Sequence, residues 1–481
     1  MSRLSIENRR AGTRLRMGGV VHPYGYGVTD EAPLRRRDEP EPAGDGRPLP
    51  EPPDPTSGGP DPLPAAVPLT APREGTPRPV ESGTELATVV ARMAAGTGPV
   101  AVDAERASGY RYTQRAYLVQ LRRAGAGTAL VDPVGCPDLT TLGEALAGAE
   151  WVLHAANQDL PCLREIGMMP RRLFDTELAG RLAGFERVGL GALVERLLGF
   201  TLEKGHAAVD WSKRPLPEPW LRYAALDVEL LVDLRDALAE ELLRQGKFDW
   251  ALEEFEALVV APPAPARPDP WRRTSGIHRV RNRRQLAAIR SLWEARDQVA
   301  RERDVAPGRI VPDSALVAAA IGGPSSATEL MEIDGYTGRG ARRYAGTFAA
   351  ALHAAARLPE SALPRPVPVG DGPPPANRWA DRDPVAAARL SKARAALAAI
   401  ADDHNLPVEN LLSPELVRRL AWTPPVPATE SAVAIALTEG GARAWQVRLT
   451  TRVLVDALAV DESRASTTPA AIPSGDPCCE G

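Results

Sequence analysis

The chain has 481 residues, of which 44% are hydrophobic, 25% charged and 5% aromatic. At about 100–200 residues per domain, this length predicts two to four domains, and the composition excludes a wholly disordered or fibrous protein. The formal net charge of −4 does not by itself indicate a nucleic-acid-binding protein.

Cysteine content and hydropathy limit the cellular setting. Four cysteines in a chain of this length do not make a disulfide scaffold. No run of about 18 apolar residues predicts a transmembrane helix, and the first residues lack the apolar segment of a secretory signal. We therefore expect a cytoplasmic protein that has no membrane partner.

Proline divides the chain into segments. The 48 prolines are about twice the usual share of roughly 5%, and fifteen of them lie between residues 31 and 80. Residues 1–79 are rich in proline, glycine and charged side chains, which predicts a disordered extension. We also predict a basic linker at 256–282, a proline-rich linker at 357–380 and a disordered tail at 461–481.

The segment 80–255 is predicted to be an α/β domain. Leu86, Val89 and Met93 recur at helical spacing, and residues 99–103 are typical of a buried strand. Further strands are predicted at 117–121, 128–132 and 151–154, and further helices at 139–147, 158–167, 175–183, 189–198 and 217–244. Strands that come early and helices that come late favour a mixed sheet.

Two helical segments follow, at 283–356 and 381–460. In each, a charged helix end precedes a proline turn and a helix for which Asp313 or Ser413 is the predicted N-cap. This similarity predicts a tandem repeat. Residues 271–310 hold eleven arginines and only four acidic residues, which favours contact with nucleic-acid phosphates. The alternative is a solvated helix face in a chain that is arginine-rich throughout.

Acidic residues stand at three places where an α/β domain exposes active sites. Asp103 and Glu105 end the first strand and, at i and i+2, face the same way. Asp159 follows the strand that ends at His154, and Asp227 lies one helical turn after Tyr223. Converging carboxylates repel one another unless cations neutralise them, and carboxylate oxygens suit Mg²⁺ or Mn²⁺. Each acid alone fits a helix cap or a solvated surface; their order and spacing together favour one shared site.

These residues resemble a known family. Asp103-Ala-Glu105, Asn157-Gln-Asp159 and Tyr223-x-x-x-Asp227 resemble the three exonuclease motifs of the tyrosine-containing branch of the DEDD superfamily, and more narrowly the ribonuclease D family. Residues 283–356 resemble the helicase-and-RNase-D C-terminal (HRDC) domain, and 381–460 a degenerate second copy. The resemblance implies an α/β, ribonuclease-H-like nuclease domain with a mixed sheet at 80–255, followed by one or two all-α helical domains.

The same resemblance implies a 3′-5′ exoribonuclease that releases 5′-monophosphates, with RNA, and tRNA precursors in particular, as substrate. It implies two divalent ions, Mg²⁺ or Mn²⁺, held by Asp103, Glu105, Asp159 and Asp227, with Tyr223 orienting the attacking water. No small-molecule cofactor and a monomeric state are expected. The alternatives are an exonuclease that prefers DNA and a non-catalytic RNA-binding protein.

Substrate contacts are predicted outside the metal ligands. Phosphates are expected to meet Lys213 or Arg214 beside the nuclease site, and Arg281, Arg283 and Arg284 in the basic stretch; solvated charges are the alternative. Trp271 and Tyr336 are candidates to stack on bases, whereas Trp293, His154 and Gln120 are expected to be structural. At one position the chain departs from the family pattern, because Arg106 follows Glu105 where many relatives have a small hydroxyl residue.

Overall fold

A computed structural model describes residues 66–203, 205, 206, 208–366 and 372–459. The disorder predicted for the tail 461–481 and for most of 1–79 therefore lies outside the described residues. The described chain forms two compact units, one with the strands and the helices up to α14 and one with the later helices α15, α16 and α18–α20. No helix of the described residues is long and apolar enough to cross a membrane.

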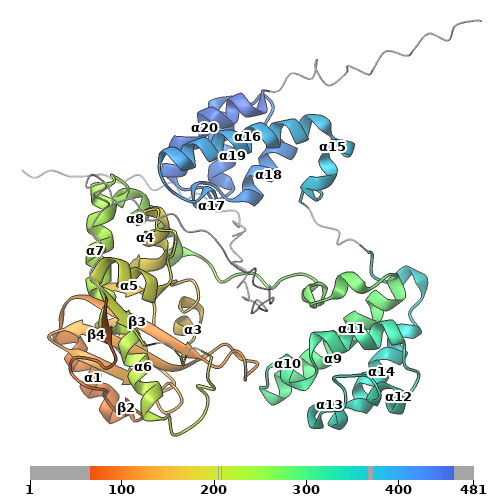
Figure 1. Ribbon diagram of the computed structural model, residues 1–481, viewed down its shortest axis with the longest axis horizontal. Coiled ribbons are helices and arrows are strands. Elements are labelled where there is room, and N and C mark those ends of the chain that lie inside the picture. Colours follow the sequence, from red (N-terminus) through yellow and green to blue (C-terminus); the bar gives the residue numbers. More distant parts are fainter. Residues whose placement is uncertain (1–65, 204, 207, 367–371, 460–481) are drawn as a thin grey trace, which may run out of the picture. The chain divides into compact units, whose positions relative to one another are not determined.

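A six-stranded mixed sheet forms the centre of the first unit (Figure 1). The strand order is β2-β5-β4-β3-β6-β7. β4 is antiparallel to both β3 and β5, whereas the β2/β5, β3/β6 and β6/β7 pairs are parallel. The strands are β2 (Pro79–Val80), β3 (Thr97–Arg106), β4 (Ala116–Ala124), β5 (Gly127–Val131), β6 (Glu150–Leu153) and β7 (Arg172–Asp175). The predicted mixed sheet is confirmed.

Short strands are where the structure differs from the sequence-based expectation. Strand β1 (Val67–Leu69) pairs in parallel with β8 (Phe200–Leu202) as a separate two-stranded sheet. Ordered structure therefore begins before residue 80, and β7 and β8 were not expected at all. Strands of two to four residues are too short to show an alternating pattern, so pairing with distant segments decides whether they form.

Helices cover the sheet, and α6 positions the candidate site. Helix α6 (Glu218–Glu229) packs across β3, β4 and β5. The predicted single helix at 217–244 is two helices, because the backbone leaves helical geometry at Leu230 before α7 (Leu231–Arg244) begins. The others are α1 (Gly83–Ala95), α2 (Thr140–Ala145), α3 (Leu160–Glu165), α4 (Thr176–Leu182), α5 (Leu190–Leu198) and α8 (Phe248–Val260).

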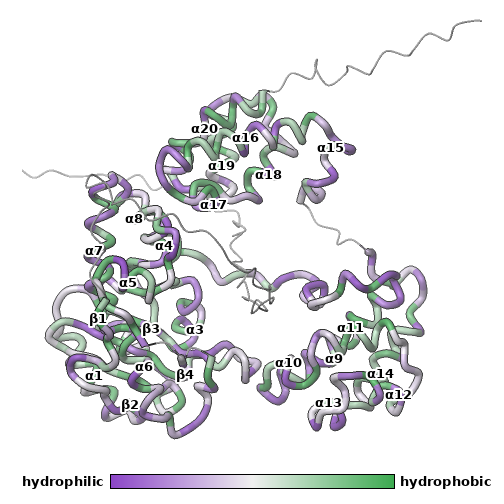
Figure 2. Tube along the Cα trace, in the orientation of Figure 1, coloured by the Kyte–Doolittle hydropathy of each residue, from purple (hydrophilic) through white to green (hydrophobic). Residues whose placement is uncertain are grey.

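The core of the sheet domain is apolar and follows the predicted periodicity. The buried face of α1 consists of Leu86, Val89 and Met93, and Ser82 caps the helix by accepting a hydrogen bond from the Glu85 amide. Figure 2 shows hydrophobic stretches along the strands and along the helices of both units. Burying such side chains stabilises the fold by about 1.5–3 kcal/mol each.

The helices after the linker form a domain around α9 (Arg283–Arg303), which packs on α10 (Pro307–Ile310), α11 (Asp313–Gly322) and α14 (Ala345–Ala356). Two short helices, α12 (Ala327–Met331) and α13 (Arg339–Arg343), lie between α11 and α14 along the chain. Asp313 is not the N-cap that the sequence predicted. Its carboxylate instead pairs with buried Arg296 at 2.8 Å and accepts a hydrogen bond from the Ser275 amide.

The second unit is also helical. It contains α15 (Trp379–Arg382), α16 (Pro384–Asp403), α18 (Pro414–Trp422), α19 (Glu430–Glu439) and α20 (Ala444–Leu458), and α17 (Val408–Leu411) lies between α16 and α18 along the chain. Ser413 caps α18 as predicted, because its side chain accepts from the Leu416 amide. Trp379 and Trp422 stack with their ring centroids 4.8 Å apart.

Candidate active site

Three of the predicted ligands meet at the face of the sheet that α6 covers. Asp103 and Glu105 project from β3, and Asp227 projects from α6. One carboxylate oxygen of each lies within 4.8 Å of one of each of the others. Oxygens at this spacing are close enough to share one hard divalent cation. The strand supplies two ligands by its two-residue period, and packing of the helix supplies the third.

Asp159 lies beside this cluster but is not part of it. It stands at the N-terminal end of α3, and its side chain makes no capping hydrogen bond there. One of its carboxylate oxygens instead lies 3.4 Å from Nη2 of Arg106. Asp159 is nevertheless close enough to the cluster for the charge of Asp103 to raise its pKa.

The ionised form of all four carboxyl groups is disfavoured. Burial raises the pKa of Asp103, Glu105, Asp159 and Asp227, and the charge of Asp103 raises the pKa of the other three further. Removing a carboxylate from water disfavours its ionised form, and a like charge nearby adds to that cost. A divalent cation would remove both penalties, so the donor set fits Mg²⁺ or Mn²⁺.

Tyr223 faces this centre from the same helix as Asp227. Its hydroxyl donates a hydrogen bond to the Asp227 carboxylate, which lowers the pKa of that acid. Burial, together with the nearby negative charges, raises the pKa of Tyr223 above its usual value of 10.0. The phenol therefore stays protonated at neutral pH and can orient a bound water rather than remove its proton.

A buried carboxylate fixes the turn that carries Asp159. Asp175 ends β7 and accepts four backbone N–H groups, two from the turn after β6 and two from the first turn of α4; these belong to Ala155, Ala156, Glu177 and Leu178. Ala155 adopts a left-handed backbone with φ 57°, a strain that such hydrogen bonds can hold. Burial raises the pKa of Asp175 to about 6. The sequence analysis did not identify this residue as a candidate.

Gln120 is buried and His154 is half-buried, as residues with a structural role would be. His154 Nδ1 lies 2.9 Å from the Thr176 hydroxyl, and burial lowers the pKa of the imidazole to about 4. Gln120 stands opposite Asp103 in the β3/β4 register. Within the described residues, neither polar atom of its amide has a hydrogen-bond partner.

Arg214 is not free to bind a phosphate, which corrects the sequence-based expectation. Its Nε and Nη2 donate to the two carboxylate oxygens of buried Asp132 at 2.5 and 2.6 Å. The remaining donors reach the carbonyls of Trp211, Lys213 and Tyr117. A guanidinium whose donors are all occupied holds the loop before α6 in place. Lys213 beside it is exposed and stays a predicted phosphate contact.

The aromatic stacking residues were also predicted wrongly. Tyr336 is fully buried in the core of the domain around α9 and lies edge-to-face with Phe348. Trp271 is buried as well, and its indole N–H donates to Asp269. Neither ring has a face open to a base. Burying the large apolar surface of an aromatic ring in the core stabilises the fold more than leaving it exposed.

Two arginines of the basic stretch contact the chain that follows α14. Arg283 donates to the carbonyls of Leu363 and Pro364, and Arg284 donates to Ala356 and pairs with Glu360 at 2.8 Å. Both therefore hold the chain that leaves α14, and a phosphate contact by either stays a prediction.

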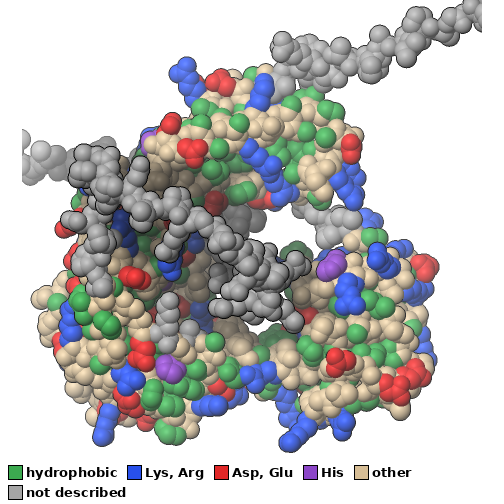
Figure 3. All heavy atoms as spheres, viewed as in Figure 1, with side chains coloured by type: hydrophobic (Ala, Val, Ile, Leu, Met, Phe, Trp, Pro, Cys, Tyr) green, Lys and Arg blue, Asp and Glu red, His purple; other side chains and the backbone are tan. Residues whose placement is uncertain are grey.

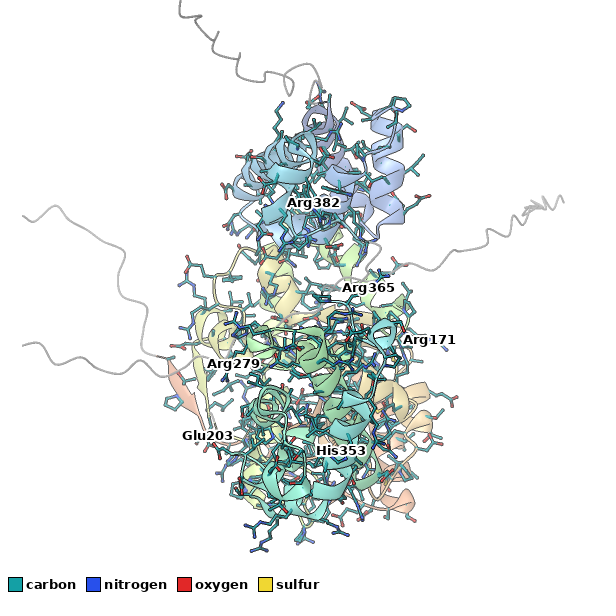
Figure 4. All side chains as sticks on the ribbon, turned by 90° about the vertical axis from the view of Figure 1, so that its right-hand side faces the viewer. Arg171, Glu203, Arg279, His353, Arg365 and Arg382 are labelled. Atoms are coloured by element: carbon teal, nitrogen blue, oxygen red, sulfur yellow. The ribbon has the colours of Figure 1, made fainter. Side chains whose placement is uncertain are left out.

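Three further exposed arginines of this stretch also contact the protein: Arg301 pairs with Asp297, Arg303 donates to the Tyr344 hydroxyl and Arg309 donates to the Gly109 carbonyl. The exposed arginines for which the described residues show no such contact are Arg273, Arg279 and Arg281. Arg279 is labelled in Figure 4. On the face of the molecule drawn in Figure 3, basic side chains are interspersed with acidic ones.

Comparison with known families identifies three matching segments. A model described as "3'-5' exonuclease" matches residues 77–243, and the HRDC domain model matches residues 285–352. A third model, described as "3' to 5' exonuclease C-terminal domain", matches residues 372–458. The last helical segment thus has a family description of its own.

Curated relatives and solved structures agree with these matches. The ribonuclease D of Gluconacetobacter diazotrophicus is 36% identical over 335 residues, which cover 68% of this chain and 81% of the relative. The ribonuclease D of Escherichia coli is 34% identical over 278 residues, 56% of this chain and 72% of the relative.

Among solved structures, a protein from Bifidobacterium adolescentis is 38% identical with a TM-score of 0.74, covering 82% of this chain and 99% of that one. Escherichia coli RNase D, titled "an exoribonuclease involved in structured RNA processing", is 26% identical with a TM-score of 0.58. That match covers 79% of this chain and 98% of the other.

Replacing Asp175 by Asn tests its role in the turn. The pKa of Asp175 is about 6 in the folded protein, against 3.8 for an ordinary aspartate. Between pH 3.8 and 6 the carboxyl group is therefore protonated in the folded protein and ionised in the unfolded chain. Wild-type stability from this group is therefore largest below about pH 4 and falls as pH rises through 6, by about 3 kcal/mol. Urea unfolding of both proteins should show the destabilisation by Asn greatest near pH 4 and smallest above pH 7. A pH-independent difference would contradict the assignment.

Replacing Arg214 by Gln should lower the free energy of unfolding by about 3 kcal/mol, because it leaves buried Asp132 without its partner. The matched control is Lys213→Gln, which removes an exposed charge next to it and should change stability by less than about 0.5 kcal/mol. Urea unfolding of the two variants makes the comparison. Equal losses would show that Arg214 is not the clamp that the hydrogen bonds indicate.

Proposed function

The chain belongs to the ribonuclease D family, and from this membership we propose that it shortens RNA from the 3′ end by two-metal-ion hydrolysis, releasing 5′-monophosphates. The observation that carries the proposal is the buried cluster of Asp103, Glu105 and Asp227, with Asp159 beside it. As a member of that family it is a nuclease and a hydrolase. Its site residues, the number of its metal ions and its natural RNA are parts of the proposal.

We assign the two ions to four carboxylates. Asp103, Glu105 and Asp227 are near enough to share one ion, and we assign a second ion to Asp159 beside that group. Bound Mg²⁺ or Mn²⁺ would stabilise charge on the attacked phosphate and lower the pKa of an attacking water. The raised carboxyl pKa values are a cost of burial that cation binding would offset.

Tyr223 has a positioning role in this scheme. Its hydroxyl is protonated, points into the acidic centre and already donates to Asp227. A protonated phenol fixed by a helix can hold the attacking water in line with the scissile bond. Such positioning lowers the entropy cost of the reaction.

The substrate is proposed to be structured RNA, with 3′ maturation of tRNA precursors as the leading case. Family membership and the helical domain at 285–352 support this choice. Arg273, Arg279 and Arg281 form the surface that we assign to phosphate contacts, because they are exposed and none has a side-chain ion pair among the described residues. The cytoplasmic location and the monomeric state stay predictions from the sequence.

Asp103→Asn and Asp227→Asn should each abolish hydrolysis while the protein still folds. Each change removes an anionic ligand at nearly constant volume. The assay uses 3′-labelled and 5′-labelled RNA with Mg²⁺ and then EDTA, alongside matched DNA oligomers, and circular dichroism checks the fold. Substantial activity in either variant would contradict the site assignment. Faster digestion of DNA would favour the DNA-preferring alternative, and an inert wild type would favour a non-catalytic RNA-binding protein.

The combined variant Arg273→Gln, Arg279→Gln, Arg281→Gln should weaken RNA binding and lower its salt dependence. Each lost contact to single-stranded RNA should reduce the slope of log K against log salt by about 0.7, or about 2 for all three. Fluorescence anisotropy in the inactive Asp227→Asn background measures this. The matched control is the triple change to Gln of three exposed arginines on α13, Arg339, Arg342 and Arg343. Equal losses in both would mean that net charge, not this surface, binds RNA.

A further inference from the structure

Arg106 is placed inside the acidic centre by the strand that carries two of its carboxylates. It is the last residue of β3, directly after Glu105. The β3/β4 register shifts between Glu105 and Arg106. Such a bulge interrupts the alternation of side chains along a strand and redirects those that follow. The guanidinium reaches Asp159, with 3.4 Å between Nη2 and the carboxylate oxygen.

This contact separates Asp159 from the other three acids. Asp103, Glu105 and Asp227 lie within 4.8 Å of one another, and Asp159 lies outside that group. Asp159 is almost fully buried, and its partner in this structure is the arginine. The acid that would complete a second cation site is thus already paired with a cation that belongs to the chain.

The charge of Arg106 acts on the rest of the centre as well. It lowers the pKa of Asp103, Glu105 and Asp159, against the opposing effects of burial and mutual repulsion. The chain itself therefore supplies a counter-charge to these acids. A divalent ion that binds Asp159 is repelled by the positive guanidinium. It must also displace the guanidinium from the carboxylate oxygen.

We propose that Arg106 is a positioning residue that competes with a divalent cation for Asp159 and thereby weakens metal binding at that side of the site. In the metal-free protein the arginine neutralises part of the buried negative charge. When an ion binds Asp159, the guanidinium must leave the carboxylate. The inference rests on the proposed metal site and adds that the chain itself sets the affinity of that site.

The test measures Mn²⁺ binding by isothermal titration calorimetry on the full chain after removal of metals with EDTA. Arg106→Gln should bind the weaker Mn²⁺ ion about tenfold more tightly than the wild type, as expected for loss of one nearby positive charge. Arg106→Lys keeps the charge and should bind Mn²⁺ close to the wild-type value. Without metal, Arg106→Gln should have a lower melting temperature than the wild type, and saturating Mn²⁺ should reduce that difference.

Arg115→Gln is the matched control. Arg115 also follows β3 and is exposed, but its guanidinium lies over the Tyr117 ring. Its Mn²⁺ affinity should be unchanged. Unchanged or weaker Mn²⁺ binding by Arg106→Gln would overturn the inference, as would an Arg106→Lys variant that binds as tightly as Arg106→Gln. Absence of Mn²⁺ binding by the wild type, or undiminished binding by Asp227→Asn, would instead overturn the proposed metal site.

Discussion

Mutual repulsion of four carboxylates is the constraint on which the nuclease domain depends. Glu105 and Asp159 are buried, Asp103 and Asp227 are half-buried, and the charge of Asp103 raises the pKa of the other three. A fold that gathers such charges loses stability unless cations or hydrogen bonds compensate. Compensation within the chain comes from the Tyr223 hydroxyl at Asp227 and from the Arg106 guanidinium at Asp159. Divalent ions, as proposed, would supply the remainder, so the same arrangement that costs stability creates affinity for metal.

Polar groups that do not touch the proposed ligands hold the segments that carry them. Asp175 gathers four amides so that the turn before Asp159 keeps its shape, and Asp132 binds Arg214 so that the loop before α6 stays closed against the sheet. Buried carboxylates thus appear in two roles. Those that are fully hydrogen-bonded organise backbone, and those that lack such partners form the acidic centre.

Several arginines of the helical domain around α9 contact the domain itself. Arg283, Arg284 and Arg296 satisfy carbonyls and acids at helix ends, where backbone oxygens have no helical partner. The local excess of arginine is therefore not a measure of the surface offered to RNA. The surface that we assign to RNA lies between η1 (Pro270–Arg273) and the start of α9, although the arginines of α13 are exposed as well.

The sequence by itself predicted the mixed sheet from the order of its strands and helices. It predicted three of the candidate ligands from spacing within single elements, two residues along β3 and four along α6. It could not determine which charged side chains pair with other groups of the protein. Asp132 and Arg214 stand 82 residues apart, and the Ala155 amide and Asp175 stand 20 apart, so sheet register and helix packing alone bring them together. The same packing buried Tyr336, paired β1 with β8 and turned Arg106 toward Asp159. Local periodicity can be read from the sequence, whereas distant polar groups pair only after the core has folded.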